Sequence, residues 1–167
     1  ITDGNFGIAL RCSKEIRLSS KESLRNMPSM LHHEFSSTIL WHGAQCLDAE
    51  VNRKVNELQN RFLNLNGDFS YDKSIEGGGA NSNLAWKTID EGTKIGQHFY
   101  RFYYSTSTFE NDFNIIAESL FTDGEKTIDF MTRNIDRPVG KKIHLVLEYY
   151  QSVDAHFTQA YFRSQKL

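Results

Sequence analysis

Residues 29–42 read Ser-Met-Leu-His-His-Glu-Phe-Ser-Ser-Thr-Ile-Leu-Trp-His. The stretch contains neither Pro nor Gly, and it lies between Pro28 and Gly43, two residue types that begin or end helices. We therefore expect a helix over residues 29–42. Ser29 is expected near its N-cap, because a serine hydroxyl can accept a hydrogen bond from a free amide of the first turn.

This predicted helix carries the densest cluster of reactive side chains in the chain, His32-His33-Glu34. In zinc hydrolases of the HExxH type, two histidines four residues apart bind one metal ion, and the glutamate after the first activates the bound water. His33 and Glu34 match the first two positions, but Ser37 stands at the fourth, where its hydroxyl is a poor zinc ligand. His42 would lie on the opposite side of the helix. The motif is half present, and the alternative that these histidines are ordinary surface or hydrogen-bonded residues stays open.

Farther along the chain, apolar residues recur three and four positions apart, as in amphipathic helices. The pattern predicts helices over residues 47–65 and 109–121, a short helix after the break at Asp123-Gly124, another helix after Pro138, and a helical C-terminus. The residues expected on the inward faces of these helices are Leu47, Val51, Val55, Leu58, Phe62, Leu65, Phe109, Phe113, Ile116, Ala117, Leu120, Phe121, Val139, Ile143, Val146, Leu147 and Tyr150, and the helical C-terminus is expected to run through Phe157 and Tyr161.

Strands are expected near the N-terminus, where residues 6–10 are mostly apolar and residues 15–19 alternate between polar and apolar. The aromatic run of residues 99–104 is most simply explained as a further strand. Its alternative is a groove for a peptide or glycan, formed together with the glycine-rich residues 77–83. Residues 66–96 have little periodicity and predict a long loop. The fold class expected from these patterns is α+β, mostly helical with a small N-terminal β-sheet.

The composition limits the remaining possibilities. A chain of 167 residues is expected to form a single domain over residues 1–167. With 19 Lys and Arg against 21 Asp and Glu, the charge gives no reason to expect a nucleic acid or an anionic membrane as partner. No apolar run approaches the roughly 18 residues that cross a bilayer. Cys12 and Cys46 are too far apart for a CxxC motif, and a disulfide between them stays open.

Three stretches resemble a family of exported bacterial lipoprotein zinc metallopeptidases. Ile16-Arg17-Leu18 with Met30-Leu31-His32-His33-Glu34-Phe35-Ser36-Ser37-Thr38-Ile39-Leu40 is similar to the family's edge strand and active-site helix. Residues 111–121 are similar to the helix that carries its acidic third ligand, and residues 141–151 to its C-terminal helix. The HHEF sequence is the specific part of this likeness.

The resemblance implies a zincin-like fold and zinc as cofactor, with His33 as first zinc ligand, Glu34 as general base and Glu118 as acidic ligand. The family's second histidine falls on Ser37, and in some relatives the acidic residue falls on Ile115, one turn before Glu118. The implied function is hydrolysis or binding of peptides, in which a zinc-bound water loses its proton to Glu34. The alternatives are an inactive pseudo-peptidase that binds a peptide or glycan and, for Glu118, an ordinary surface carboxylate.

The same resemblance implies a location. Members are exported, so we expect this chain in the periplasm or at the outer membrane. Because it begins with Ile1, we expect it to be the trimmed catalytic-domain part of a longer precursor, which can carry a lipid anchor.

Overall fold

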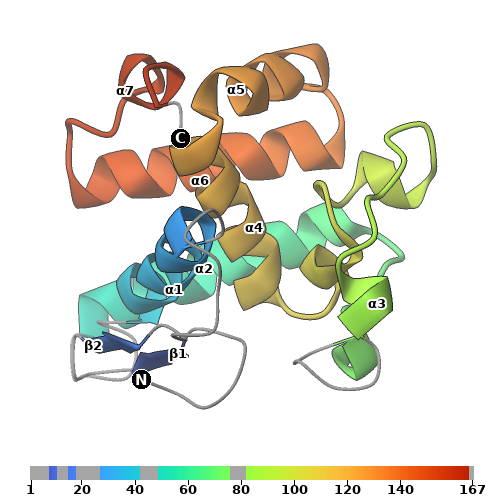
Figure 1. The fold of residues 1–167 in the computed structure, drawn as a ribbon, viewed down its shortest axis with the longest axis horizontal. Coiled ribbons are helices and arrows are strands. Elements are labelled where there is room, and N and C mark those ends of the chain that lie inside the picture. Colours follow the sequence, from blue (N-terminus) through green and yellow to red (C-terminus); the bar gives the residue numbers. More distant parts are fainter. Residues whose placement is uncertain (1–7, 11–14, 18–26, 42–48, 76–81, 166–167) are drawn as a thin grey trace.

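Helix α4 (Phe109–Thr122) lies at the centre of the structure, and the other long helices all contact it (Figure 1). The computed structural model describes residues 8–10, 15–17, 27–41, 49–75 and 82–165. All residues from 111 to 121 are buried, so α4 is covered on every side. The helices around it are α1 (Met27–Trp41), α2 (Ala49–Asn66), α5 (Gly124–Arg133), α6 (Pro138–Val153) and the short α7 (Gln159–Arg163).

The expected α+β class is wrong, because the described residues form a helical protein. The only strand segments in this part of the chain are β1 (Ile8–Leu10) and β2 (Glu15–Arg17), which pair as one antiparallel hairpin of three residues each. A hairpin of this size cannot form the sheet layer that an α+β domain packs its helices against. In the described residues this hairpin is all that is present of the small N-terminal β-sheet expected of a zincin-like fold, and it gives no sheet layer.

The aromatic run of residues 99–104 does not form the expected strand either. Its only ladder contact is an isolated bridge between Thr88 and Phe102, and the chain then enters the 3-10 helix η3 (Tyr103–Thr106). The reason lies in the next three residues, whose hydroxyls each donate to a carbonyl three positions earlier at 2.7 Å. Such local hydrogen bonds favour turns over an extended strand. These residues are Ser105, Thr106 and Ser107.

The predicted helices are present, with shifted ends. Helix α1 begins at Met27, so Pro28 lies in its first turn and Ser29 is not its N-cap. Helix α4 is capped by Thr108, whose hydroxyl accepts a hydrogen bond from the amide of Asn111 at 3.1 Å. The expected loop of residues 66–96 also contains three short turns of helix, η1 (Lys73–Ile75), α3 (Ser82–Ala85) and η2 (Ile95–Gln97).

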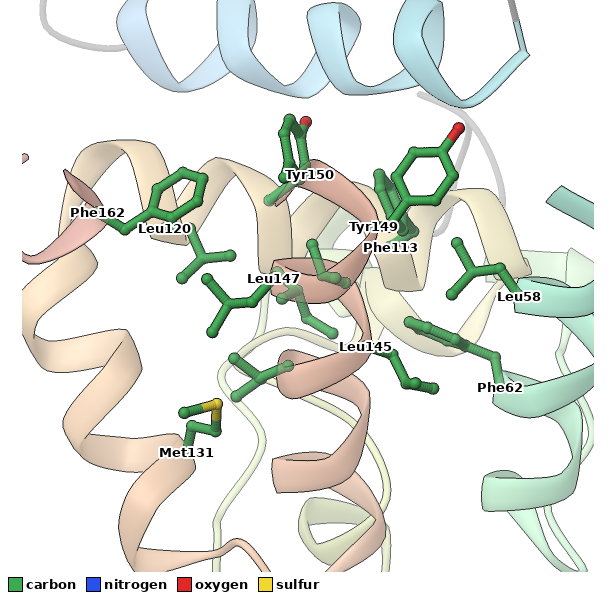
Figure 2. Close-up of a cluster of buried hydrophobic side chains, with 14 of the residues drawn as sticks. Leu58, Phe62, Phe113, Leu120, Met131, Leu145, Leu147, Tyr149, Tyr150 and Phe162 are labelled. Atoms are coloured by element: carbon green, nitrogen blue, oxygen red, sulfur yellow. The ribbon is translucent and has the colours of Figure 1, made fainter. Parts of the chain in front are cut away.

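The hydrophobic core lies between α2, α4, α5, α6 and α7 (Figure 2). Phe121, near the C-terminal end of α4, packs edge-to-face against Tyr150, Phe157 and Phe162. These contacts join α4 to α6 and α7. Edge-to-face aromatic pairs add stability beyond the area that they bury. The approach of α5 to α7 is so close that a Cβ on Gly124 would lie 1.9 Å from the carbonyl oxygen of Phe162.

One charged pair lies inside this core. Lys142 on α6 donates to Asp112 on α4, with 2.6 Å between Nζ and Oδ2, and both side chains are fully buried. The Tyr71 hydroxyl donates to the same oxygen at 3.0 Å. The ammonium also lies over the rings of Phe99 and Phe62, at 4.0 and 5.6 Å from their centroids.

None of the helices in the described ranges has the length and apolar character needed to cross a membrane. Several residues named in the sequence analysis lie outside the described residues: Cys12, His42, Gly43, Cys46, Leu47 and residues 77–81. They include both cysteines of the possible disulfide and most of the glycine-rich stretch of the possible groove.

Candidate functional site

Helices α1 and α4 pack together and bring the histidine cluster against α4. The Nδ1 atom of His33 lies 3.5 Å from Oε2 of Glu118, and the two side chains are 13% and 10% exposed. His33 and Glu118, named above as the first and the acidic ligand, are far apart in the sequence and thus lie side by side in the structure. Glu118 is not an ordinary surface carboxylate.

A second polar contact joins the same two helices one turn away. Asn114 Nδ2 donates a hydrogen bond of 2.6 Å to Ser37 Oγ, and both residues are buried. Ser37 follows His33 by four residues and Asn114 precedes Glu118 by four, so the two contacts lie next to each other along the helix interface. Ile115, the other position considered for the acid, is 1% exposed and belongs to the core.

These side chains do not fit a zinc ion. A catalytic zinc site normally has three protein ligands, and the position of the second histidine holds Ser37, whose hydroxyl is taken by Asn114. Within the described ranges no three His, Cys, Asp or Glu side chains are grouped so that they could hold a metal. Glu34, the expected general base, is half-buried on α1 beside His33, and its backbone carbonyl accepts from Thr38 Oγ1 at 3.0 Å.

His32 has a different environment from His33. Its ring stacks on Phe121, with 4.5 Å between the centroids and 3° between the planes. Its buried Nδ1 has no hydrogen-bond partner. Burial lowers the pKa of His32, and the nearby charge of Glu118 opposes that shift. Burial therefore favours the neutral form of this imidazole, and the ring packs against Phe121.

A row of aromatic rings leads from the His33–Glu118 pair to the surface. Tyr104 lies beside His33 at a centroid distance of 5.8 Å, and Trp86 stacks on Tyr104 at 5.2 Å with 26° between the planes. Trp86 also contacts Phe102 edge-to-face and is 45% exposed. We call Trp86, Tyr104 and His33 the aromatic row.

Sequence reasoning missed two members of this region. Trp86 is a lone tryptophan in a polar stretch that the sequence predicted to be a loop, and a large apolar residue there is itself a signal of binding. Asn114 shares a helix face with Glu118 because four residues separate them. That spacing was available from the sequence, whereas the pairing of Asn114 with Ser37 depends on how α1 packs against α4.

No protein-family model, curated protein sequence or solved structure matches this chain. A function for this chain is therefore inferred from the contacts around His33, Glu118 and the aromatic row.

Proposed function

We propose that this chain binds peptides at a metallopeptidase-like site that works without a metal ion. The observation that carries the proposal is the aromatic row, which runs from the exposed Trp86 to the His33–Glu118 pair. A half-exposed tryptophan offers apolar area to a peptide side chain. The imidazole and carboxylate at the other end can hydrogen-bond to peptide amides and carbonyls.

The Ser37–Asn114 hydrogen bond supports binding over hydrolysis. In this hydrogen bond Ser37, which stands at the second ligand position, accepts from Asn114 in a short, buried contact between α1 and α4. Replacing that contact would leave a buried amide unsatisfied, which is costly. The likeness to exported metallopeptidases supports a location at the cell envelope.

The second candidate is a zinc peptidase, which the 3.5 Å approach of His33 to Glu118 favours. It requires stoichiometric zinc in the purified protein and peptide hydrolysis that Glu34→Gln abolishes. Peptide binding without metal requires neither.

The test is fluorescence anisotropy with a panel of labelled dodecapeptides of varied sequence, in buffer with and without EDTA. We expect saturable binding that EDTA does not change and that Trp86→Ala weakens about tenfold or more, as for a central aromatic contact. Leu63→Ala is the matched control, because Leu63 is an apolar residue on α2 with a similar exposure of 43%.

Three results would contradict the proposal. Loss of binding in EDTA, or zinc-dependent cleavage of the peptides, would favour the peptidase. Equal losses in Trp86→Ala and Leu63→Ala would exclude the aromatic row as the site. Binding to soluble glycans but to no peptide, measured in the same way, would assign the site to a different ligand class.

A further inference from the structure

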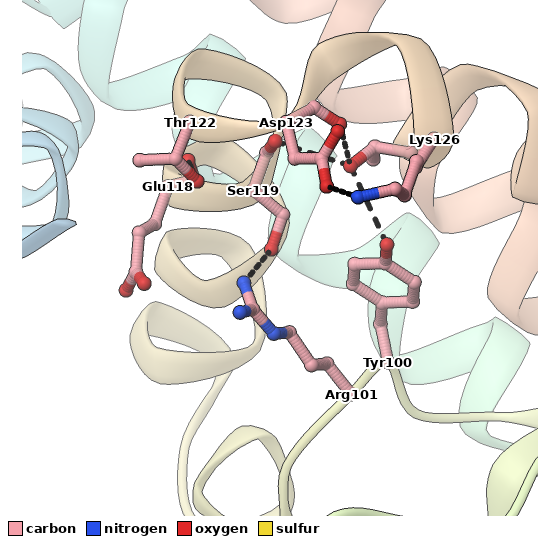
Figure 3. A network of polar contacts seen from close by, with 8 residues as sticks. Tyr100, Arg101, Glu118, Ser119, Thr122, Asp123 and Lys126 are labelled. Atoms are coloured by element: carbon pink, nitrogen blue, oxygen red, sulfur yellow. Dashed lines mark hydrogen bonds and ion pairs between the residues drawn. The ribbon is translucent and has the colours of Figure 1, made fainter. Parts of the chain in front are cut away.

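A second site lies at the side of α4 from which Ser119 projects, away from the side chain of Glu118 (Figure 3). A cleft of about 320 Å³ is enclosed by α4, α5 and residues 88–101. Its size is in the usual range for small-molecule sites. Apolar residues form part of its wall, namely Ile89, Phe99 and Phe130, and the hydroxyl-bearing residues Tyr100, Ser119 and Thr127 line it as well.

The charged residues of the cleft leave a positive excess. Three cations and two carboxylates line it: Arg101, Lys126, Arg133, Glu91 and Asp123. Lys126 Nζ and Asp123 Oδ2 form an ion pair at 2.6 Å, so these two charges offset each other. Arg101 and Arg133 form no ion pair with any described residue. The five groups therefore sum to one positive charge, and neither guanidinium is neutralised by a carboxylate among the described residues.

The backbone of Arg101 is strained in a way that positions its side chain. Its φ of 68° lies in the left-handed region, which residues other than glycine rarely adopt. The carbonyl of Arg101 is held there by the amide of Ile89 at 2.8 Å. From this position the guanidinium reaches α4, where its Nη1 donates to Ser119 Oγ at 3.1 Å (Figure 3). The guanidinium carbon also lies over the ring of Phe102, at 4.7 Å from its centroid.

We infer that this cleft binds a small organic monocarboxylate. Arg101 and Arg133 are the guanidinium-bearing residues that line the cleft, and a planar guanidinium matches the two oxygens of a carboxylate. The apolar body of the ligand lies against Ile89, Phe99 and Phe130. A doubly charged phosphate fits less well, since the net charge is only one positive and the Glu91 carboxylate lies in the same cleft. No residue of the aromatic row lines this cleft, so binding at each site can be measured by itself, although Phe102 contacts both Trp86 and Arg101.

The first test is isothermal titration calorimetry of the full chain with phenylacetate, hexanoate, their neutral amides and inorganic phosphate. We expect saturable binding of at least one carboxylate with a stoichiometry of one. The matching amide and phosphate should bind at least about tenfold more weakly, because a charge-assisted hydrogen bond is lost or a repulsion is gained. Equal binding of acid and amide, or no binding of either carboxylate, would overturn the inference.

The second test separates recognition from structure at Arg101. Glycine adopts a positive φ without strain, so Arg101→Gly should keep or raise the melting temperature while it weakens carboxylate binding at least about tenfold. Arg133→Gln should weaken binding as well. Arg53→Gln is the matched control, because Arg53 is an exposed arginine on α2 that does not line the cleft.

The variants also define what would count against the site. A lower melting temperature in Arg101→Gly with unchanged carboxylate affinity would mean that Arg101 only braces α4 through Ser119. Equal weakening in Arg133→Gln and Arg53→Gln would mean that only the overall charge of the protein matters.

Discussion

His32 and His33 are adjacent in the sequence but have different roles in the structure. One helix residue corresponds to a rotation of about 100°, so neighbouring side chains leave α1 in different directions. His33 faces Glu118, whereas His32 stacks on Phe121 and keeps a buried, unpartnered Nδ1. Two histidines that form one reactive cluster in the sequence therefore differ in the structure: His33 pairs with a carboxylate, and His32 packs its ring on an aromatic side chain.

The environment of His32 predicts a loss of stability in acid. Burial lowers its pKa in the folded state, so the unfolded chain takes up the proton more readily. The stabilising contribution is therefore complete above the ordinary histidine pKa of about 6.5 and is lost as the pH falls through the lower, folded value. Urea unfolding at pH 7.5, 6.5 and 5.5 measures the slope, which for one group cannot exceed about 1.4 kcal/mol per pH unit.

The variant that tests this is His32→Phe, which keeps a ring on Phe121 and removes the titrating group. We expect its free energy of unfolding to depend less on pH than that of the unmodified protein. His156→Gln serves as the control histidine variant, because the His156 side chain is 93% exposed. Identical slopes in His32→Phe and the unmodified protein would show that His32 does not contribute.

At the scale of elements, the ion pair between Lys142 and Asp112 fixes how α6 lies on α4. Burial raises the pKa of Asp112, an effect that Lys142 opposes, and burial lowers the pKa of Lys142. We expect Lys142→Met to destabilise the fold by about 3–5 kcal/mol, because it leaves a buried carboxylate without its cation. Asp112→Leu with Lys142→Met should recover much of that loss, since no charge is then buried.

Urea denaturation measures both changes, and an exposed pair provides the control. Lys126→Met removes a partner of Asp123 at the same 2.6 Å distance, but its side chain is 83% exposed, so the cost should be below about 1 kcal/mol. A similar cost for Lys142→Met and Lys126→Met would show that burial of the first pair has no energetic consequence.

The helices were largely predictable from the sequence, because an apolar stripe is a local property. Val55, Leu58 and Phe62 are buried along α2 as expected, and the breaks at Asp123-Gly124 and Pro138 separate α4, α5 and α6. The strand expected at residues 99–104 was wrong, because hydroxyls from residues beyond the run turn the chain.

The site was predictable only in part. The resemblance to a metallopeptidase family grouped His33 and Glu118 in one metal site. The structure brings the two side chains together, without a third such ligand grouped with them among the described residues. The pairing of Ser37 with Asn114 needs the packing of α1 on α4, which no local pattern contains. The cleft at Arg101 depends on a backbone angle, and nothing in the identity of an arginine predicts a left-handed φ.

For the whole molecule, the central place of α4 separates two surfaces. Glu118 and Ser119 are consecutive, yet Glu118 faces α1 and His33 while Ser119 faces Arg101 and the cleft (Figure 3). Because α4 is buried along its length, it is the rigid support of both sites. Residues 86–104 contribute to both sites. Trp86 and Tyr104 belong to the aromatic row, and Arg101 lines the cleft.

This arrangement predicts unequal local stability. Helix α4 is buried on every side and α6 buries the face that packs into the core, so we expect their amides to exchange with solvent only when the whole fold opens. Residues 90–94 are exposed, and their backbone is held by single turn hydrogen bonds such as that from Thr93 to Asp90 at 3.1 Å. We therefore expect residues 86–98 to exchange through local openings that cost far less than global unfolding.

Hydrogen exchange with mass spectrometry, repeated at low urea concentrations, tests this directly. Peptides from α4 and α6 should exchange slowest, and their rates should rise with urea as steeply as global unfolding does. The peptide covering residues 86–98 should exchange much earlier and respond little to urea. If α6 exchanged as early as residues 86–98, or if both responded equally to urea, α4 and α6 would not form the stable unit that supports the aromatic row and the cleft.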